Sequence, residues 1–155
     1  MTELTTSPPR PSGLYAIFSV GDRAARKLVP QGNDQIDEVY RLRMLEARPK
    51  IALRLGTVVG PAEELFWRAW VQPRVGRGLS PTQRVAAGAA AYASAHLVTR
   101  NFTLVGAAAV AGAYWGALYE TGVDLESLIV SHVLWDTVIL LLRPTGASRQ
   151  ALAAV

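Results

Sequence analysis

Residues 101–119 have the sequence NFTLVGAAAVAGAYWGALY, which contains no ionisable side chain other than tyrosine. A helix needs about twenty predominantly apolar residues to cross the hydrocarbon layer of a bilayer. Gly112 and Gly116 stand four residues apart in this stretch, a spacing that lets two membrane helices approach closely. The stretch therefore predicts a membrane-spanning helix that packs tightly against a neighbour.

Three further apolar segments lie around it, at about residues 51–71, 83–99 and 125–142. Arg100 and Asn101 leave almost no loop between the second and third segments, so these should form a tight antiparallel hairpin. Arg100 is also the only Lys or Arg between Val85 and Leu142, whereas a soluble helical protein carries charge on each exposed helix face. We therefore expect an all-α fold, a multi-pass transmembrane helical bundle with about four core helices in a cell membrane, most simply a bacterial one.

Composition agrees with this interpretation. Half of the residues are hydrophobic and 18% are charged, below the roughly 25% of an average soluble domain. The net charge is +4, and many of the basic residues precede the apolar region, where anionic lipid head groups are the simplest partner. We expect contact with membrane lipid and none with nucleic acid. The chain has no cysteine, which excludes disulfides and thiolate metal sites.

The chain divides into four predicted regions. They are a disordered leader (1–12), a partly helical N-terminal segment (13–50), the transmembrane core (51–142) and a C-terminal tail (143–155). In the second region, residues 14–20 form an apolar stump too short to span a bilayer. They are followed by a charged amphipathic helix from Asp34 to Arg48, which Pro49 is expected to end.

Ionisable side chains inside the apolar segments share one spacing. The pairs are Glu64 and Arg68, Tyr92 and His96, and His132 and Asp136. Residues four apart lie on the same face of a helix, so each helix can present a polar pair inward. Ionisable groups at membrane depth are costly and usually have a partner or a function. Taken singly, each pair could serve packing alone; together they suggest a hydrolytic or proton-handling site.

Gly60 and Pro61 precede the first of these pairs. Proline is tolerated in the first turn of a helix and breaks a helix further in. We therefore expect the first apolar segment to be interrupted there, with a new helical stretch from Ala62 to Arg68 beside a cavity.

The three polar groups match a known pattern in order and spacing. They are EELFWR with Glu63, Glu64 and Arg68, YASAH with Tyr92 and His96, and HVLWD with His132 and Asp136. This pattern resembles the EExxxR, FxxxH and HxxxN/D motifs of the CPBP family of glutamic intramembrane endopeptidases, which includes the type II CAAX prenyl proteases. The resemblance covers about residues 50–142.

The resemblance implies a metal-independent protease that cleaves a peptide bond within the membrane. By analogy, Glu63 is the general base that activates water and His96 helps to hold that water. His132 and Asp136 would stabilise the oxyanion. Asp136 stands where many members have Asn; an ionised Asp cannot donate a hydrogen bond, so it would have to be protonated or orient His132 instead.

Three residues have supporting roles under the same resemblance. Glu64 and Arg68 would hold the helix and orient Glu63. Tyr92 replaces the usual Phe and adds a hydroxyl that needs a partner. Family members usually carry further transmembrane helices upstream of the first motif. A form of such a protein that is truncated at its N-terminus is therefore one interpretation of this chain.

Other functions stay open. A metal site with Glu63, His96 and His132 as zinc ligands is one alternative, and a catalytically inactive membrane adaptor or scaffold is another. HExxH and GxSG motifs are absent, which disfavours zinc proteases of that class and rhomboid-type serine proteases. The resemblance implies a peptide or membrane-protein substrate, and it leaves CAAX-type, bacteriocin-like and regulatory substrates open. The sequence does not indicate an oligomeric state.

Overall fold

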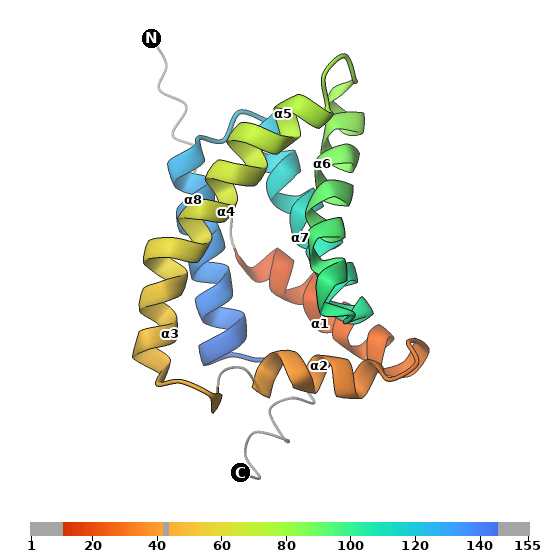
Figure 1. Cartoon of the computed structure of the whole chain (residues 1–155), viewed down its shortest axis with the longest axis vertical. Helices are drawn as coiled ribbons and strands as arrows, with labels where there is room; N and C mark the ends of the chain where they lie inside the picture. The colour runs from red at the N-terminus through yellow and green to blue at the C-terminus, as the bar shows by residue number, and fades with distance from the viewer. Residues whose placement is uncertain (1–10, 42–43, 146–155) are drawn as a thin grey trace.

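A computed structural model describes residues 11–41 and 44–145, and every regular element in these ranges is a helix (Figure 1), which confirms the predicted all-α class. The main body consists of α3 (Arg48–Arg54), η2 (Leu55–Val59), α4 (Gly60–Glu64), η3 (Leu65–Val71), α5 (Gln72–Val75), α6 (Pro81–Ala95), η4 (His96–Thr99), α7 (Phe102–Glu120), α8 (Leu125–Asp136) and η5 (Thr137–Leu142). The elements from α3 to α5 follow one another without a break and form one continuous rod. This rod, α6, α7 and the joined α8 and η5 run alternately up and down the molecule (Figure 1).

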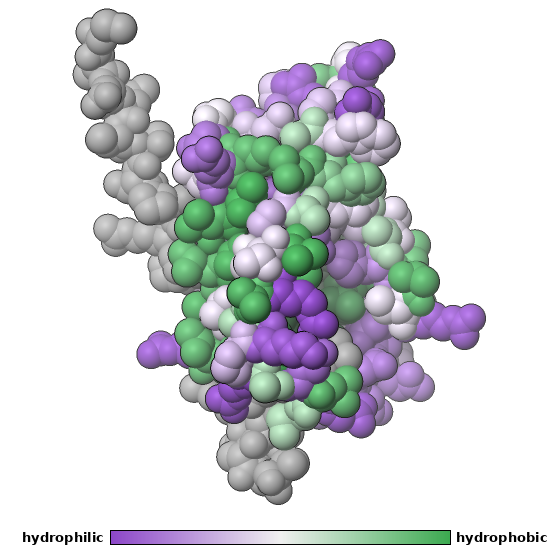
Figure 2. All heavy atoms as spheres, turned by 60° about the vertical axis from the view of Figure 1, so that its left-hand side comes forward, coloured by the Kyte–Doolittle hydropathy of each residue, from purple (hydrophilic) through white to green (hydrophobic). Residues whose placement is uncertain are grey.

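Two of these segments are long and apolar enough to cross a membrane. They are α7 and the joined α8 and η5, which correspond to the last two predicted spans. The rod also exposes large apolar side chains, including Leu53, Val58, Phe66 and Trp70. Hydrophobic residues cover much of the upper part of the face in Figure 2, and hydrophilic residues gather at its top edge and lower down. That the rod and α6 also cross the membrane remains a prediction.

Pro61 does not interrupt the first segment, so the predicted break at Gly60 is wrong. Gly60 keeps a helical conformation, and its N–H donates to the carbonyl of Leu55, five residues earlier. The π-helical turn η2 thus widens the helix immediately before the proline. The same arrangement precedes Pro73, where the N–H of Gln72 donates to a carbonyl five residues back. A π-turn changes the hydrogen-bond register locally, and we infer that this accommodates a residue that lacks an N–H.

The tight hairpin between α6 and α7 is confirmed. Arg100 reverses the chain in the left-handed conformation, with φ of 56°. Asn101 then caps α7, because its side-chain oxygen accepts a 2.9 Å hydrogen bond from the N–H of Leu104. A loop of two residues therefore suffices to place α6 beside α7.

Small residues allow close packing at this hairpin, as the sequence predicts. A Cβ atom added to Gly112 would lie 3.0 Å from the ring of Tyr92. One added to Gly116 would lie 3.0 Å from Oε1 of Gln72, and one added to Gly88 would lie 3.1 Å from the same side chain. The two glycines of α7 thus allow α6 and the rod to pack closely against this helix.

Two N-terminal helices, α1 (Pro11–Leu28) and α2 (Gly32–Arg41), pack on the main body. The apolar stump at residues 14–20 belongs to the longer helix α1, in which Leu14 is only 2% exposed and lies in the main core. The ring of Phe18 meets the ring of Trp135 with centroids 4.7 Å apart. The predicted disordered leader falls outside the described residues except at 11–12, where α1 begins, and the predicted tail does so beyond residue 145.

The predicted charged helix is shorter than expected. The described part of α2 ends at Arg41, and residues 44–47 are not α-helical. Pro49 does not end a helix but lies in the first turn of α3. Proline is favoured at that position because the first N–H groups of a helix have no intrahelical partner.

Candidate active site

His132 lies at the centre of the polar side chains inside the bundle. It comes from α8 and is 3% exposed. Its Nδ1 lies 2.6 Å from Oε1 of Glu64 on α4. A carboxylate oxygen accepts, so Nδ1 carries the hydrogen of this bond and Nε2 is left for other partners. The contact fixes both the tautomer and the orientation of the ring.

Glu64 also contacts Arg68, the partner expected from the helical spacing. Arg68 Nε lies 3.2 Å from Glu64 Oε2, and both side chains are 1% exposed. The distance is that of an ion pair, although the angles are not those of a hydrogen bond. The guanidinium also lies over the ring of Tyr92, 5.6 Å from its centroid. Glu64 thus connects the buried arginine to the imidazole.

Glu63 and Asp136 face the other nitrogen of the same imidazole. Glu63 Oε2 lies 3.9 Å and Asp136 Oδ2 lies 3.7 Å from Nε2 of His132. Their side chains are 29% and 19% exposed, against 1% for Glu64. The two glutamates therefore differ in kind: Glu64 is enclosed, whereas Glu63 is accessible. Three carboxyl groups beside one imidazole and one guanidinium can hold and transfer a proton.

The hydroxyl of Tyr92, which was predicted to need a hydrogen-bond partner, has one in Glu63. Its Oη donates a 2.6 Å hydrogen bond to Oε2 of Glu63, and the side chain is 6% exposed. The ring packs edge-on against Trp67, with centroids 5.2 Å apart. Because this packing fixes the ring, the hydroxyl is held in place to orient Glu63.

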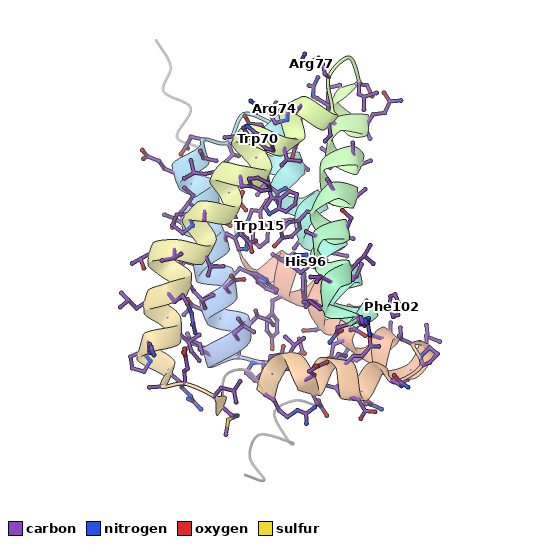
Figure 3. All side chains as sticks on the ribbon, viewed as in Figure 1. Trp70, Arg74, Arg77, His96, Phe102 and Trp115 are labelled. Carbon is purple, nitrogen blue, oxygen red and sulfur yellow. The ribbon has the colours of Figure 1, made fainter. Side chains whose placement is uncertain are left out.

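His96 contacts Tyr92 but, in the described part of the chain, is not bonded to the carboxylates or to His132. It follows the last residue of α6, and its Nδ1 donates to the carbonyl of Tyr92 at 3.0 Å. Its ring meets that of Tyr92 with centroids 4.9 Å apart. Within residues 11–41 and 44–145, no hydrogen bond or ion pair joins it to Glu63 or His132. In Figure 3 it lies near the lower end of α6. The ion-pair contacts of the described residues therefore join Glu63, His132 and Asp136 but do not include His96.

The alternative zinc set is not assembled for the same reason. No group of three or more His, Asp and Glu side chains in the described part of the chain is placed to hold a metal ion. His96, one of the three predicted ligands, is directed to its own helix backbone.

Two buried residues that connect helices were not found from the sequence, and one of them lies at the site. Trp115 is 1% exposed and stacks on His132, with ring centroids 4.0 Å apart at an angle of 16°. Nothing local marks this contact between helices. Gln72 is fully buried and donates to the carbonyl of Gly116 at 3.1 Å and to Glu120 Oε1 at 3.0 Å. It continues the four-residue spacing of Glu64 and Arg68, a signal that could have been used.

Comparison with known proteins bears on this arrangement. The family model described as type II CAAX prenyl endopeptidase Rce1-like matches residues 47–138, from the start of the rod into η5. No match was found among curated proteins or among solved structures. The matched region contains all three motifs and more than half of the chain, in agreement with the resemblance found from the sequence. The chain is therefore a membrane protein that belongs to the Rce1-like family of type II CAAX prenyl endopeptidases.

Proposed function

We propose that this chain is an intramembrane endopeptidase that hydrolyses a peptide bond of a membrane-associated substrate. One observation carries the proposal: the imidazole of His132 lies between the carboxyl groups of two consecutive glutamates. Glu64 bonds Nδ1 at 2.6 Å, and Glu63 lies 3.9 Å from Nε2. An enclosed carboxylate that orients a histidine, beside an accessible one that can reach water, is a suitable arrangement for acid–base chemistry.

In this mechanism Glu63 is the general base. It removes a proton from a water molecule as the water oxygen attacks the carbonyl carbon of the scissile bond. The carbonyl oxygen becomes an oxyanion, which His132 stabilises through a protonated Nε2 while Glu64 holds Nδ1. Glu63 then returns the proton to the leaving nitrogen as the C–N bond breaks. Asp136, 3.7 Å from the same Nε2, would help to keep that nitrogen protonated.

His96 has a less direct place in this proposal than the sequence suggests. Its Nδ1 is committed to the carbonyl of Tyr92, so Nε2 is the nitrogen left for water or substrate. The family description names CAAX prenyl substrates, so a prenylated CAAX peptide is the first substrate to test. Bacteriocin-like and regulatory membrane peptides form the rest of the panel.

Cleavage by the full chain in proteoliposomes tests the proposal, with products identified by mass spectrometry. Glu63→Gln should lower the cleavage rate by about 10²–10⁴-fold, as is typical for loss of a general base. Glu126→Gln is the matched control, because Glu126 is an exposed glutamate on the first turn of α8. Equal rates for Glu63→Gln and wild type would exclude the glutamic mechanism. A wild type that cleaves no peptide of the panel would favour the adaptor alternative.

A further inference from the structure

A cavity lies away from the site, where the rod ends and α6 begins. It has a volume of about 330 Å³, and its polar lining includes Arg77, Arg84, Tyr119 and Glu120. Its walls come from the turn between α5 and α6 and from the end of α7. None of these residues belongs to the polar group around His132.

Arg84 and Glu120 form a closed pair within this cavity. Nε and Nη2 of Arg84 donate to Glu120 Oε2 at 2.9 and 2.7 Å. The other oxygen of Glu120 accepts from Gln72 at 3.0 Å. Gly76 makes room for this pair, because a Cβ atom there would lie 2.4 Å from the Arg84 side chain. The negative charge of Glu120 is thus compensated inside the protein.

Arg77 supplies a positive charge that the protein leaves uncompensated. Its side chain is exposed and makes no hydrogen bond or ion pair within the described ranges. Arg74, three residues earlier, lies over the ring of Trp70 at 4.5 Å and donates to the Trp70 carbonyl. Figure 3 shows Arg77, Arg74 and Trp70 at the same end of the bundle. The carboxylate of the lining, Glu120, is paired with Arg84, so it would not repel an anion that approaches the cavity.

The cavity also lies at a defined depth. Glu120 ends one of the two helices that are long and apolar enough to cross a membrane, and Leu125 begins the other. If both cross, this end of the bundle lies where the hydrocarbon layer meets the head groups. Tryptophan and tyrosine favour that level, as do arginines that bind lipid phosphate. Val75 and Leu79 beside the turn are large apolar residues, 45% and 37% exposed, and can contact acyl chains.

We propose that this cavity binds the phosphate group of an anionic glycerophospholipid, with Arg77 as its main donor. A guanidinium can donate two parallel hydrogen bonds to a phosphate, which a lysine cannot. Tyr119 lines the same cavity, and because Arg84 neutralises Glu120, the positive charge of Arg77 is left for the phosphate. The proposal does not depend on catalysis.

Thermal unfolding of the full chain in detergent, with added lipid of matched acyl chains, tests it. Phosphatidylglycerol should raise the midpoint of the wild type above the value with phosphatidylcholine, because a ligand that binds only the folded state stabilises it. Arg77→Gln should bind phosphatidylglycerol at least tenfold more weakly. Arg100→Gln is the matched control: Arg100 is an exposed arginine in the short loop at the other end of α6. It should keep the wild-type response.

Two results would overturn the proposal. Equal losses in Arg77→Gln and Arg100→Gln would mean that anionic lipid is attracted by the surface as a whole. Stabilisation by inorganic phosphate as large as that by phosphatidylglycerol would mean that the cavity takes a soluble anion and not a lipid.

Discussion

The hydroxyl of Tyr92 on α6 donates a 2.6 Å hydrogen bond to Oε2 of Glu63 on α4, and so joins two helices at the site. The same carboxylate oxygen lies 3.9 Å from Nε2 of His132. Tyr92 therefore limits the rotation of Glu63 and keeps it directed toward the imidazole. The oxygen that distinguishes tyrosine from the usual phenylalanine thus lies at the carboxylate that we propose as the general base.

Tyr92→Phe should lower kcat about tenfold, the equivalent of about 1.4 kcal/mol in activation free energy. KM should change little, because the ring that fills the core is kept. The peptide cleavage assay gives both constants. In a Glu63→Gln background, Tyr92→Phe should have no further effect on kcat. A further tenfold loss in that background would assign Tyr92 to packing instead of to the positioning of Glu63.

Glu64→Gln should destabilise the fold as well as lower activity. It leaves the buried guanidinium of Arg68 without its counter-charge, which costs about 3–5 kcal/mol. Thermal unfolding in detergent measures this loss. The double substitution Glu64→Gln with Arg68→Met removes both charges and should recover much of the stability, but not the rate, because His132 still lacks its carboxylate partner. Equal stability of Glu64→Gln and wild type would contradict the ion pair.

Gly60→Ala should separate α4 from α8. The new Cβ would lie 2.5 Å from Cγ2 of Val133 and 3.2 Å from the carbonyl oxygen of Leu55. Overpacking of this kind costs about 1–3 kcal/mol. Gly56→Ala, one turn earlier, is the matched control, since its Cβ would meet Val133 at an ordinary 3.7 Å. Val133→Ala should rescue Gly60→Ala in part; the absence of any rescue would place the strain elsewhere.

The number of membrane crossings can be measured with introduced cysteines, because the chain has none. Cysteines at Thr82 and Thr121, both exposed, should react with an impermeant maleimide from one side of sealed vesicles. A cysteine at Val98, which is 85% exposed, should react only from the other side. Labelling of positions 82 and 98 from the same side would show that α6 does not cross the membrane.

Several features of the site could be predicted from the sequence because they depend on helix geometry alone. Glu64 and Arg68 are four residues apart and pair as expected. The same periodicity places His132 and Asp136 on one face of α8, 3.7 Å apart. The hairpin at Arg100 and the close approach at the glycines of α7 are equally local consequences of loop length and side-chain size.

Local rules failed where a neighbouring turn could adapt. Pro61 was expected to break the helix because proline lacks an N–H, but the widened turn before it provides a different register of hydrogen bonds. Pro49 was expected to end a helix and instead begins one. Proline is compatible both with the expected helix ends and with the observed arrangements, and the sequence alone does not indicate which of them occurs.

The sequence by itself determined which side chains are costly to bury in this bundle, and hence which of them need partners, because charge, helical period and hydropathy are properties of the chain. Only the tertiary structure decided which side chains those partners are. Glu63 and Glu64 are adjacent and chemically identical, yet Glu64 is enclosed against His132 while Glu63 stays accessible beside Tyr92. His96 matches its motif but follows the end of α6, where its Nδ1 bonds the Tyr92 carbonyl and not a carboxylate of that cluster. Burial and contacts between helices depend on how segments far apart in the sequence pack, and no local spacing specifies them.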